Sequence, residues 1–453
     1  MFSMGTLGFV AAWTLAWLIA ALIPGLPRTP RARGFAWLFP AAGIALLIVF
    51  RSEPAGLRLL ASSLLFLYLM KGAVTLQSPP VRLRLLDHLL FVTIWPGMDA
   101  ESFAQRAPAP NGTGARFGRG LTLMLFGIAV AGATAIFLPW IPPMAVGWLG
   151  IAGILLTVHF GASEVMTSAL WMLGRPVRPL FDRPYASRTL SEFWTRRWNL
   201  AFVEMDRRLF LPALVGRIGL RRAIFAVFLI SGLLHEMAIS YSVGAGWGGP
   251  MLYFAIQCLG LGLERRWRVR SKLWTLAWIF VPLPLLFHTP FRNQLIVPLF
   301  VWLHHQITSQ PLTWYVGALL WSLGAMQLCV LLASSQVPKK LNWSEELPRL
   351  SPFNRKLMWT YGIFIVTTIV SFAILTLVLH DSFLRGETAA IGLASFMCGF
   401  WALRLVFDAF YFRSEDWPAG EEFKVGHALL NALFAYLVLG YGAVAAYGWL
   451  ARR

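Results

Sequence analysis

Long apolar runs alternate along this chain with short polar and basic connections, and the pattern predicts helices that cross a membrane. A helix needs about 20 apolar residues to span a bilayer. Twelve runs approach that length: 5–23, 35–50, 57–76, 121–140, 147–171, 223–243, 249–263, 273–290, 311–334, 359–380, 388–412 and 425–449. The stretch 294–306 is too short to cross and is expected to be re-entrant. We therefore predict an all-α integral membrane protein, a polytopic bundle of about 10–12 transmembrane helices.

Composition agrees with a membrane-embedded class. Only 13% of the residues are charged and 58% are hydrophobic, whereas soluble domains carry about 25% charged residues. The net charge of +19 comes from 39 Lys and Arg against 20 Asp and Glu. These basic residues lie between the apolar runs, where they set orientation and meet anionic headgroups. The lipid bilayer is thus the expected partner, and nucleic acid is not.

The densest basic segment is residues 172–222. It carries eleven arginines: Arg175, Arg178, Arg183, Arg188, Arg196, Arg197, Arg207, Arg208, Arg217, Arg221 and Arg222. Because loops rich in Lys and Arg stay on the cytoplasmic side, we predict that 172–222 is a cytoplasmic loop of a multi-pass protein in the cell (inner) membrane.

The organisation changes near residue 335. Residues 336–358 are polar, charged and proline-bearing, which is typical of a linker or surface loop. We predict a catalytic core at 1–335, a polar linker at 336–358, and C-terminal transmembrane helices of unknown role at 359–453. The sequence does not define the oligomeric state.

A histidine lies deep in the apolar run 224–243. His235, followed by Glu236, interrupts residues that are otherwise suited to the bilayer interior, where an ionisable side chain costs about 2.5–3.5 kcal/mol on insertion scales. Histidine is the side chain best suited to move protons near neutral pH. A structural hydrogen bond to a neighbouring helix is the alternative, and the pattern leaves both open. Position 239 is Ile, so the second histidine of a zinc-protease motif is missing.

Neither a metal nor a resident cofactor is expected. Cys258, Cys329 and Cys398 lie far apart in apolar runs, without the spacing of metal ligands or of a disulfide framework.

The segment 191–199, SEFWTRRWN, is aromatic and cationic. Trp194 and Trp198 are four residues apart and share a helix face, while Arg196 and Arg197 point elsewhere, towards water or phosphate. Asn199 adds a neutral donor and acceptor. An interfacial helix without catalytic function would have the same composition, so this segment alone does not define a site.

Two segments together resemble a known family. LFDRPYASRTLSEFWTRRWNLAF (180–202) followed by SGLLHE (231–236) is similar to the membrane-bound O-acyltransferase superfamily, and within it to the wax synthase branch. WPGMDAESF (95–103) resembles a segment of the same branch. The resemblance extends from about residue 80 to 245 and, more weakly, to about 330; we find none in 340–453.

The resemblance implies a helical fold around an intramembrane catalytic tunnel. It implies that His235 is the catalytic histidine and Asn199 the asparagine of the motif, with acyl-CoA as co-substrate and a hydrophobic alcohol as acceptor. We expect the residues next to them to bind substrate: Trp194, Arg196, Arg197, Trp198 and Glu236.

Three functions remain compatible with these residues. The first is synthesis of wax esters from a long-chain alcohol and acyl-CoA, with His235 as general base. The second is acylation or acetylation of a saccharide or polymer hydroxyl, which would require a polar path to the site. The third is a membrane lipid transporter that uses His235 as a proton relay, for which more paired intramembrane carboxylates would be expected.

Overall fold

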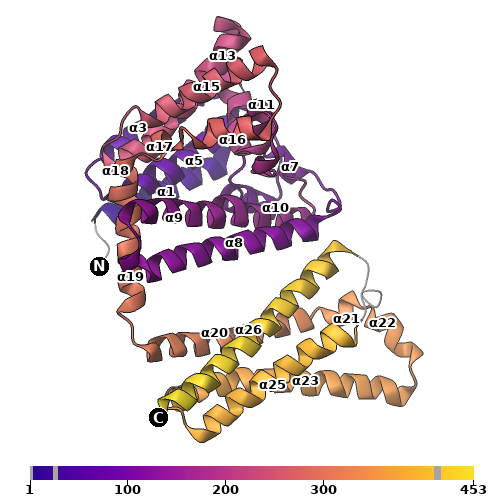
Figure 1. Ribbon diagram of the computed structural model, residues 1–453. Coiled ribbons are helices and arrows are strands. Elements are labelled where there is room, and N and C mark those ends of the chain that lie inside the picture. The colour runs from indigo at the N-terminus through magenta and orange to yellow at the C-terminus, as the bar shows by residue number, and fades with distance from the viewer. Residues whose placement is uncertain (1–3, 24–28, 413–419, 453) are drawn as a thin grey trace. The chain divides into compact units, whose positions relative to one another are not determined.

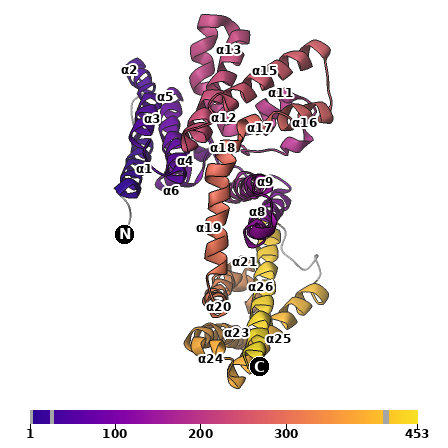
Figure 2. The ribbon, with the colours of Figure 1, turned by 60° about the vertical axis from the view of Figure 1, so that its left-hand side comes forward.

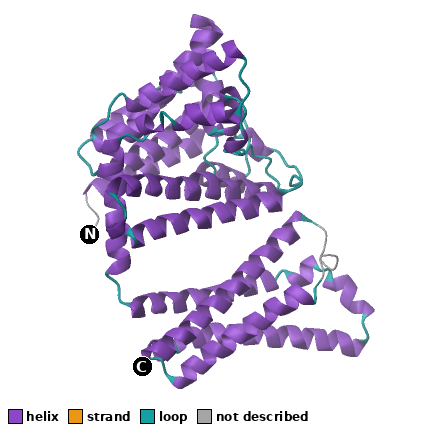
Figure 3. Cartoon of the chain, in the orientation of Figure 1, coloured by secondary structure: helices purple, strands orange, loops and turns teal. Residues whose placement is uncertain are grey.

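A computed structural model describes residues 4–23, 29–412 and 420–452 of the chain. Every regular element in the described residues is a helix (Figure 3). This confirms the predicted all-α fold. The chain forms two compact units, Met1–His305 and Gln306–Arg453.

The first unit is built from many helices, several of them short. They are α1 (Met4–Leu22), α2 (Pro30–Phe35), α3 (Leu38–Val49), α4 (Ala55–Leu60), α5 (Phe66–Gln77), α6 (Leu85–Leu89), α7 (Glu101–Ala104), α8 (Thr113–Ile136), α9 (Pro143–Ile154), α10 (Ser163–Met172), α11 (Leu190–Glu192), α12 (Leu200–Met205), α13 (Leu211–His235), α14 (Tyr241–Val243), α15 (Gly249–Trp267), α16 (Lys272–Phe280), α17 (Leu283–Leu286) and α18 (Thr289–Phe291). Helix α19 (Val297–Thr308) leads into the second unit (Figure 1).

Widened π-helical turns join many of these helices. They are η2 (Ala61–Leu65), η3 (Leu90–Ile94), η5 (Leu155–Ala162), η7 (Phe193–Arg197), η8 (Asp206–Phe210), η9 (Glu236–Ser240) and η10 (Arg292–Ile296). Such turns insert a residue into a helix and reorient the side chains that follow. Three of them, η7, η8 and η9, lie next to the residues singled out from the sequence.

Eight helices in the described residues are long and apolar enough to cross a membrane. They are Ala55–Gln77, Thr113–Ile136, Pro143–Met172, Leu200–Val243, Leu312–Lys339, Pro352–Val378, Thr388–Phe410 and Phe423–Leu450. The protein is therefore an integral, multi-pass membrane protein. Each of these helices coincides with one of the twelve predicted runs.

The other four runs make the predicted count of 10–12 too high. The runs 5–23 and 35–50 form shorter apolar helices, Leu7–Ala21 and Arg33–Val49. The run 249–263 is α15, which buries Gln257 and Glu264. The run 273–290 is continued by 294–306 in a helix pair bent by 64°, which is either a broken span or a re-entrant loop and raises the count to nine if it crosses.

The predicted cytoplasmic loop 172–222 is shorter than expected. Residues 200–222 are helical and continue into the span that contains His235. The reason is an apolar face: Met205, Leu209 and Phe210 are buried against α5 residues such as Met70 and Val74. Gly219, with a φ of 74°, kinks this long helix, because glycine adopts positive φ without steric cost.

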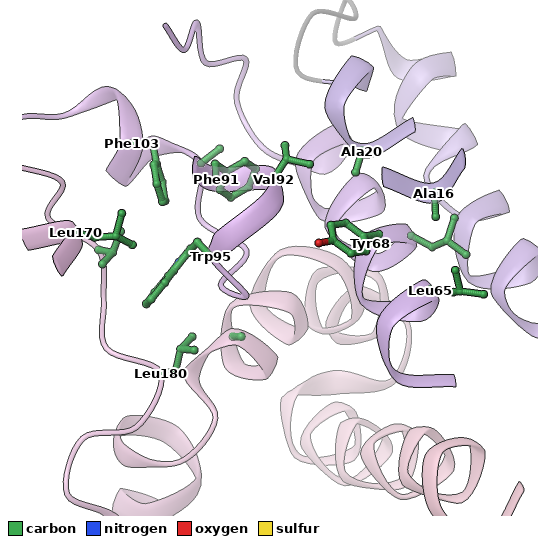
Figure 4. Packing of buried hydrophobic residues seen from close by; sticks show 14 of the residues in the cluster. Ala16, Ala20, Leu65, Tyr68, Phe91, Val92, Trp95, Phe103, Leu170 and Leu180 are labelled. Atoms are coloured by element: carbon green, nitrogen blue, oxygen red, sulfur yellow. The ribbon is translucent and has the colours of Figure 1, made fainter. Parts of the chain in front are cut away.

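The core of the first unit gathers side chains from distant segments. Ala16 of α1, Leu65 and Tyr68 of the η2–α5 helix, and Phe91 and Phe103 belong to one buried cluster (Figure 4). Lys71 is buried beside it, and its Nζ donates to the carbonyl oxygens of Phe91, at 2.6 Å, and Trp95. A buried lysine side chain thus ties α5 to the segment that resembles the wax synthase branch.

The second unit contains α20 (Leu312–Ser334), α21 (Val337–Lys340), α22 (Trp343–Glu346), α23 (Pro352–Val378), α24 (His380–Leu384), α25 (Thr388–Phe410) and α26 (Glu421–Ala451). One buried cluster joins Leu320 and Leu323 of α20 with Phe372 of α23, Trp401 of α25 and Leu437 of α26. Because α20 packs with the C-terminal helices, the compositional boundary at 335 lies inside this unit. Short helices and the start of α23 occupy the predicted linker 336–358.

Candidate active site

Hydrogen bonds at its start and its end fix the helical turn α11–η7, which carries the aromatic and basic motif at 191–199. The Thr189 hydroxyl caps α11 by accepting from the Glu192 amide at 3.0 Å, as expected for a Thr-x-x-Glu start. The Glu264 carboxylate of α15 accepts the amides of Leu190, at 2.5 Å, and Ser191, at 3.2 Å. The motif is therefore anchored to α15.

Glu192 links the two ends of the same turn. It accepts the Arg188 amide at 2.9 Å and pairs with Arg197 at 2.6 Å. The hydrogen bond from the Arg188 amide, together with the Arg197 guanidinium, holds the pKa of Glu192 below its usual range. The carboxylate is thus charged at neutral pH and holds Arg197 in place.

Aromatic stacking orients the two tryptophans. Phe193 and Trp198 stack with ring centroids 5.2 Å apart, and Trp194 packs against Phe254 of α15 at 5.6 Å. The Trp194 indole N–H lies 3.4 Å from the Gln257 side-chain oxygen. Side chains of α15 therefore hold Trp194, whereas Trp198 packs against Phe160, Phe181 and Phe193.

Asn199 lies in the left-handed region, with φ 41° and ψ 62°, directly before α12. Asparagine tolerates this conformation better than most residues. The following amide, from Leu200, donates to the Leu180 carbonyl at 2.9 Å. The strained position is thus stabilised from the flanking loop, and Asn199 lines a pocket.

His235 ends the α-helical part of α13, and the π-turn η9 follows it directly. Its Nδ1 lies 2.7 Å from the Ser231 carbonyl oxygen. A carbonyl oxygen only accepts, so Nδ1 carries the proton and Nε2 keeps its lone pair. The ring packs against Phe254, with centroids 4.6 Å apart, and Phe202 at 5.9 Å. This tautomer provides a base at Nε2.

A cavity of about 160 Å³ brings these residues together. Helices α13 and α15, which frame it, lie side by side in Figures 1 and 2. Its lining comprises Trp194, Thr195, Trp198, Asn199, Phe202, Val203, Asp206, Arg207, Leu211, Ile224, Val227, Phe228, Ser231, His235 and Phe254. Most of these side chains are aromatic or aliphatic, and the few polar groups include His235 and Asn199, which are 36 residues apart in the chain.

The remaining predicted substrate-binding residues do not line this pocket. Arg196 is exposed, and Arg197 is paired with Glu192. Glu236 is buried and caps α15 by accepting the amides of Gly248, at 2.8 Å, and Met251, at 3.1 Å. Their neighbours in sequence face the pocket, but a helix turns adjacent residues about 100° apart. Binding by these three residues stays a prediction.

Sequence reasoning missed two charged residues of the pocket, Asp206 and Arg207. A periodic signal was present, because Asn199, Phe202, Val203 and Asp206 follow the i, i+3, i+4, i+7 spacing of one helix face. The prediction of a loop at 172–222 does not use this spacing, because a loop has no helix face.

Comparison with known proteins gives a family match over the same segment. The model of the membrane-bound O-acyl transferase family matches residues 177–256. This range includes the motif, Asn199, His235 and Phe254, which together form much of the pocket lining.

Curated relatives have two kinds of names. A probable long-chain-alcohol O-fatty-acyltransferase 2 of Arabidopsis thaliana is 30% identical over 158 residues, which cover 28% of this chain and 43% of the relative. A probable long-chain-alcohol O-fatty-acyltransferase 3 of the same plant is 37% identical over 79 residues, covering 15% of this chain and 22% of the relative.

A probable alginate O-acetylase of Pseudomonas syringae is 24% identical over 229 residues, covering 44% of each chain. The matches therefore span less than half the length of these relatives.

Proposed function

We propose that this chain, which belongs to the membrane-bound O-acyltransferase superfamily, transfers an acyl group from an acyl-CoA thioester to a hydroxyl. The observation that carries the proposal is the pocket in which His235 and Asn199 meet inside an apolar helical bundle. Relatives named as O-acyltransferases support transfer to oxygen. Acyl-CoA is a co-substrate in this scheme, which uses no resident cofactor.

His235 acts as general base. The acceptor hydroxyl gives its proton to Nε2 while its oxygen forms a bond to the thioester carbonyl carbon. The carbon–sulfur bond then breaks, and the imidazolium returns the proton to the departing thiolate, so that the products are an ester and free CoA thiol. General base catalysis of this kind contributes about 10²–10⁴-fold to a rate. The Ser231 carbonyl keeps the imidazole in the required tautomer.

Asn199 stabilises the developing negative charge. Asn199 and His235 both line the pocket, and a neutral amide donor stabilises an oxyanion without adding a second base. The fixed left-handed backbone at Asn199 limits the reorganisation that the donor must undergo as charge develops.

The acceptor that fits best is a long-chain alcohol, which gives a wax-type ester. The pocket is lined by Phe202, Phe228, Phe254 and other apolar side chains, and apolar ligands gain from burial there. Sterols or diacylglycerol are weaker candidates. A second candidate reaction is acylation of a saccharide hydroxyl, which the similarity to alginate O-acetylases favours.

A labelling assay tests the reaction and separates the two acceptors. Purified protein is incubated with labelled acyl-CoA and either fatty alcohols or saccharides, and the products are separated by thin-layer chromatography. We expect a labelled neutral ester with the alcohols. Label in saccharide alone would replace the wax-ester proposal with the second candidate, and release of CoA without any acylated product would contradict both.

The same scheme requires that acyl-CoA reach the site from the cytoplasm. We propose that the arginine-bearing segment before α11 faces this side, in the cell (inner) membrane. Tyr185 is 61% exposed in that segment, and Trp140 is 75% exposed at the α8–α9 turn, one span away.

Single cysteines at these two positions test the orientation. In a background without Cys258, Cys329 and Cys398, Trp140→Cys should react with a membrane-impermeant reagent on intact cells, and Tyr185→Cys only after the cells are opened. The reverse pattern would overturn the orientation.

A further inference from the structure

Asp206 contributes the one carboxylate among the residues that line the pocket. It begins the π-turn η8, directly after α12. Its Oδ1 is buried and has no hydrogen-bond partner in the described part of the protein. A carboxylate accepts up to four hydrogen bonds, so this group has unused capacity next to a cavity.

The other buried carboxylates of the first unit have donors. Asp87 accepts from Arg106 and Arg175. Glu164 accepts from Arg119 and forms an ion pair with Arg116. Glu264 accepts the amides of Leu190 and Ser191, and Oε1 of Glu236 accepts the amides of Gly248 and Met251, while Oε2 of Glu236 has no hydrogen-bond partner among the described residues. Burying a carboxylate without such donors is costly. Asp206 differs from these four carboxylates because no group of the described residues donates a hydrogen bond to it, and it lines a cavity.

Helix geometry gives an approximate separation between Asp206 and Asn199. Asp206 follows Asn199, the residue directly before α12, by seven positions, which in a regular helix corresponds to about 10 Å along the axis. The pocket also extends from His235 to Ile224 on α13, eleven residues apart, or about 16 Å. Phe202, three residues after Asn199, contacts His235 with ring centroids 5.9 Å apart, so we infer that His235 and Asn199 lie towards one end of the lining and Asp206 further along it.

A substrate that fills this pocket meets Asp206 between apolar side chains such as Phe202, Val203 and Phe228 and the adjacent Arg207. A purely apolar chain would leave the carboxylate without water and without a donor, whereas an N–H or O–H at this depth would give it a charge-assisted hydrogen bond. Arg207, the next residue, is exposed and also lines the pocket, so this end of the cavity suits a polar portion of a substrate.

We propose that Asp206 recognises an N–H or O–H group that the substrate carries about 10 Å from its reacting carbon or oxygen. The inference rests on the acyl-transfer function proposed above. Two substrates supply this chemistry: the amide-bearing arm of an acyl-CoA, or a second hydroxyl on the acceptor. Asp206 is thereby a specificity-determining residue for the reaction at His235.

Matched substrate pairs and variants test the assignment. On the donor side, acyl-pantetheine keeps both amides and the hydroxyl, while S-acyl-N-acetylcysteamine keeps only the amide next to the thioester. On the acceptor side, a fatty alcohol is compared with the α,ω-diol of the same chain length. The variants are Asp206→Leu, which has similar volume and no acceptor, and Asp206→Asn, which keeps an acceptor oxygen.

In one of the two pairs, we expect Asp206→Leu to lower kcat/KM about ten- to a hundredfold for the compound that carries the distant N–H or O–H, which is acyl-pantetheine or the diol. For the compound that lacks this group, the loss should be less than about threefold. The pair that shows this difference identifies whether the acyl-CoA arm or the acceptor alcohol supplies the group that Asp206 binds. Asp206→Asn should restore part of the preference. Thr195→Val is the control, because the Thr195 hydroxyl also belongs to a pocket residue but already donates to the Ser191 carbonyl at 2.6 Å; it should leave the ratio within each pair unchanged.

Equal losses for both members of each pair in Asp206→Leu would overturn the inference and make Asp206 a structural residue. A wild-type protein that acylates nothing would overturn the proposed function instead. In that case binding still decides the inference: the compound with the distal donor should raise the melting temperature of the wild type more than its partner does, and Asp206→Leu should abolish the difference. No difference in the wild type would contradict it.

Discussion

The two units both bury polar side chains between apolar helices, but they use them differently. In the first unit, Asn199, Asp206 and His235 lie on the wall of one cavity. In the second unit, Tyr441 of α26 accepts from the Gln327 side chain of α20 at 2.9 Å and shares a hydrogen bond with Thr376 of α23 at 2.6 Å. One set faces space that a ligand can fill, whereas the other connects helices directly.

A second polar cluster of the C-terminal unit repeats the contrast. Asp408 of α25 accepts from Asn431 at 2.6 Å, contacts His427 at 2.5 Å, and lies 3.4 Å from Arg404. An Asp–His pair between two membrane helices suggests proton transfer by composition alone. Here the Asp408 carboxylate already has partners on both oxygens, so its evident role is to hold α25 against α26. A polar residue in an apolar helix marks a candidate site only when it faces a cavity.

The largest expected effect comes from His235→Ala, because it removes the only base that the reaction scheme uses. Ester formation should fall by about 10²–10⁴-fold, measured as turnover of labelled acyl-CoA by protein that elutes as a folded species. His304→Ala is the matched control, since His304 also contacts a carbonyl oxygen, that of Ala135 at 2.8 Å, but lies outside the pocket lining. Near-wild-type turnover in folded His235→Ala would contradict the catalytic role of the polar residues in the first unit, which is what distinguishes them from those of the second unit.

Asn199 combines a side-chain donor with an unusual backbone conformation, and two variants separate them. Asn199→Ala should lose about 10²–10³-fold in kcat, with a smaller change in KM, because an interaction made in the transition state acts on kcat. Asn199→Gly keeps the left-handed backbone without strain and should lose nearly as much. Recovery of wild-type turnover in the glycine variant would show that only the backbone matters.

Asp408→Asn tests whether the polar cluster of the second unit is structural. It weakens the contacts to His427 and Arg404 and should destabilise the protein by about 1–3 kcal/mol, seen as a lower melting temperature. Turnover per folded molecule should stay close to that of the wild type. Asp381→Asn is the control, because the Asp381 side chain is 80% exposed. A collapse of turnover in Asp408→Asn without loss of stability would assign this cluster to the reaction.

Tyr441→Phe should have the smallest effect. It removes one hydroxyl shared by Gln327 and Thr376 and keeps the ring in the core, so the expected cost is about 1 kcal/mol. Thermal unfolding in detergent would measure it, with Tyr436→Phe as control, since the hydroxyl of the more exposed Tyr436 contacts Ser322. An unchanged melting temperature for Tyr441→Phe would mean that the buried network adds no stability.

Several features of the fold could be predicted from the sequence because they depend on local composition. The length of an apolar run is enough to indicate a membrane helix, and eight of the predicted runs are such helices. The compositional boundary at 335 differs from the division into compact units after His305, because polarity marks linkers and not packing. Residues 336–358 are polar, but α20 before them packs with Phe372 and Leu437 after them, and such long-range contacts leave no local signal.

For the candidate site, too, local sequence indicated some features and long-range contacts decided the others. The sequence alone determined the membrane-spanning helical class and pointed to His235 and Asn199, because a polar residue in an apolar run is conspicuous and the surrounding motif is specific. Only the tertiary structure brought these two residues to one cavity with Asp206 and directed Glu236 to the start of α15. Whether a side chain faces a cavity or a neighbouring backbone depends on π-turns and helix contacts that join distant segments, and no single stretch of sequence encodes them.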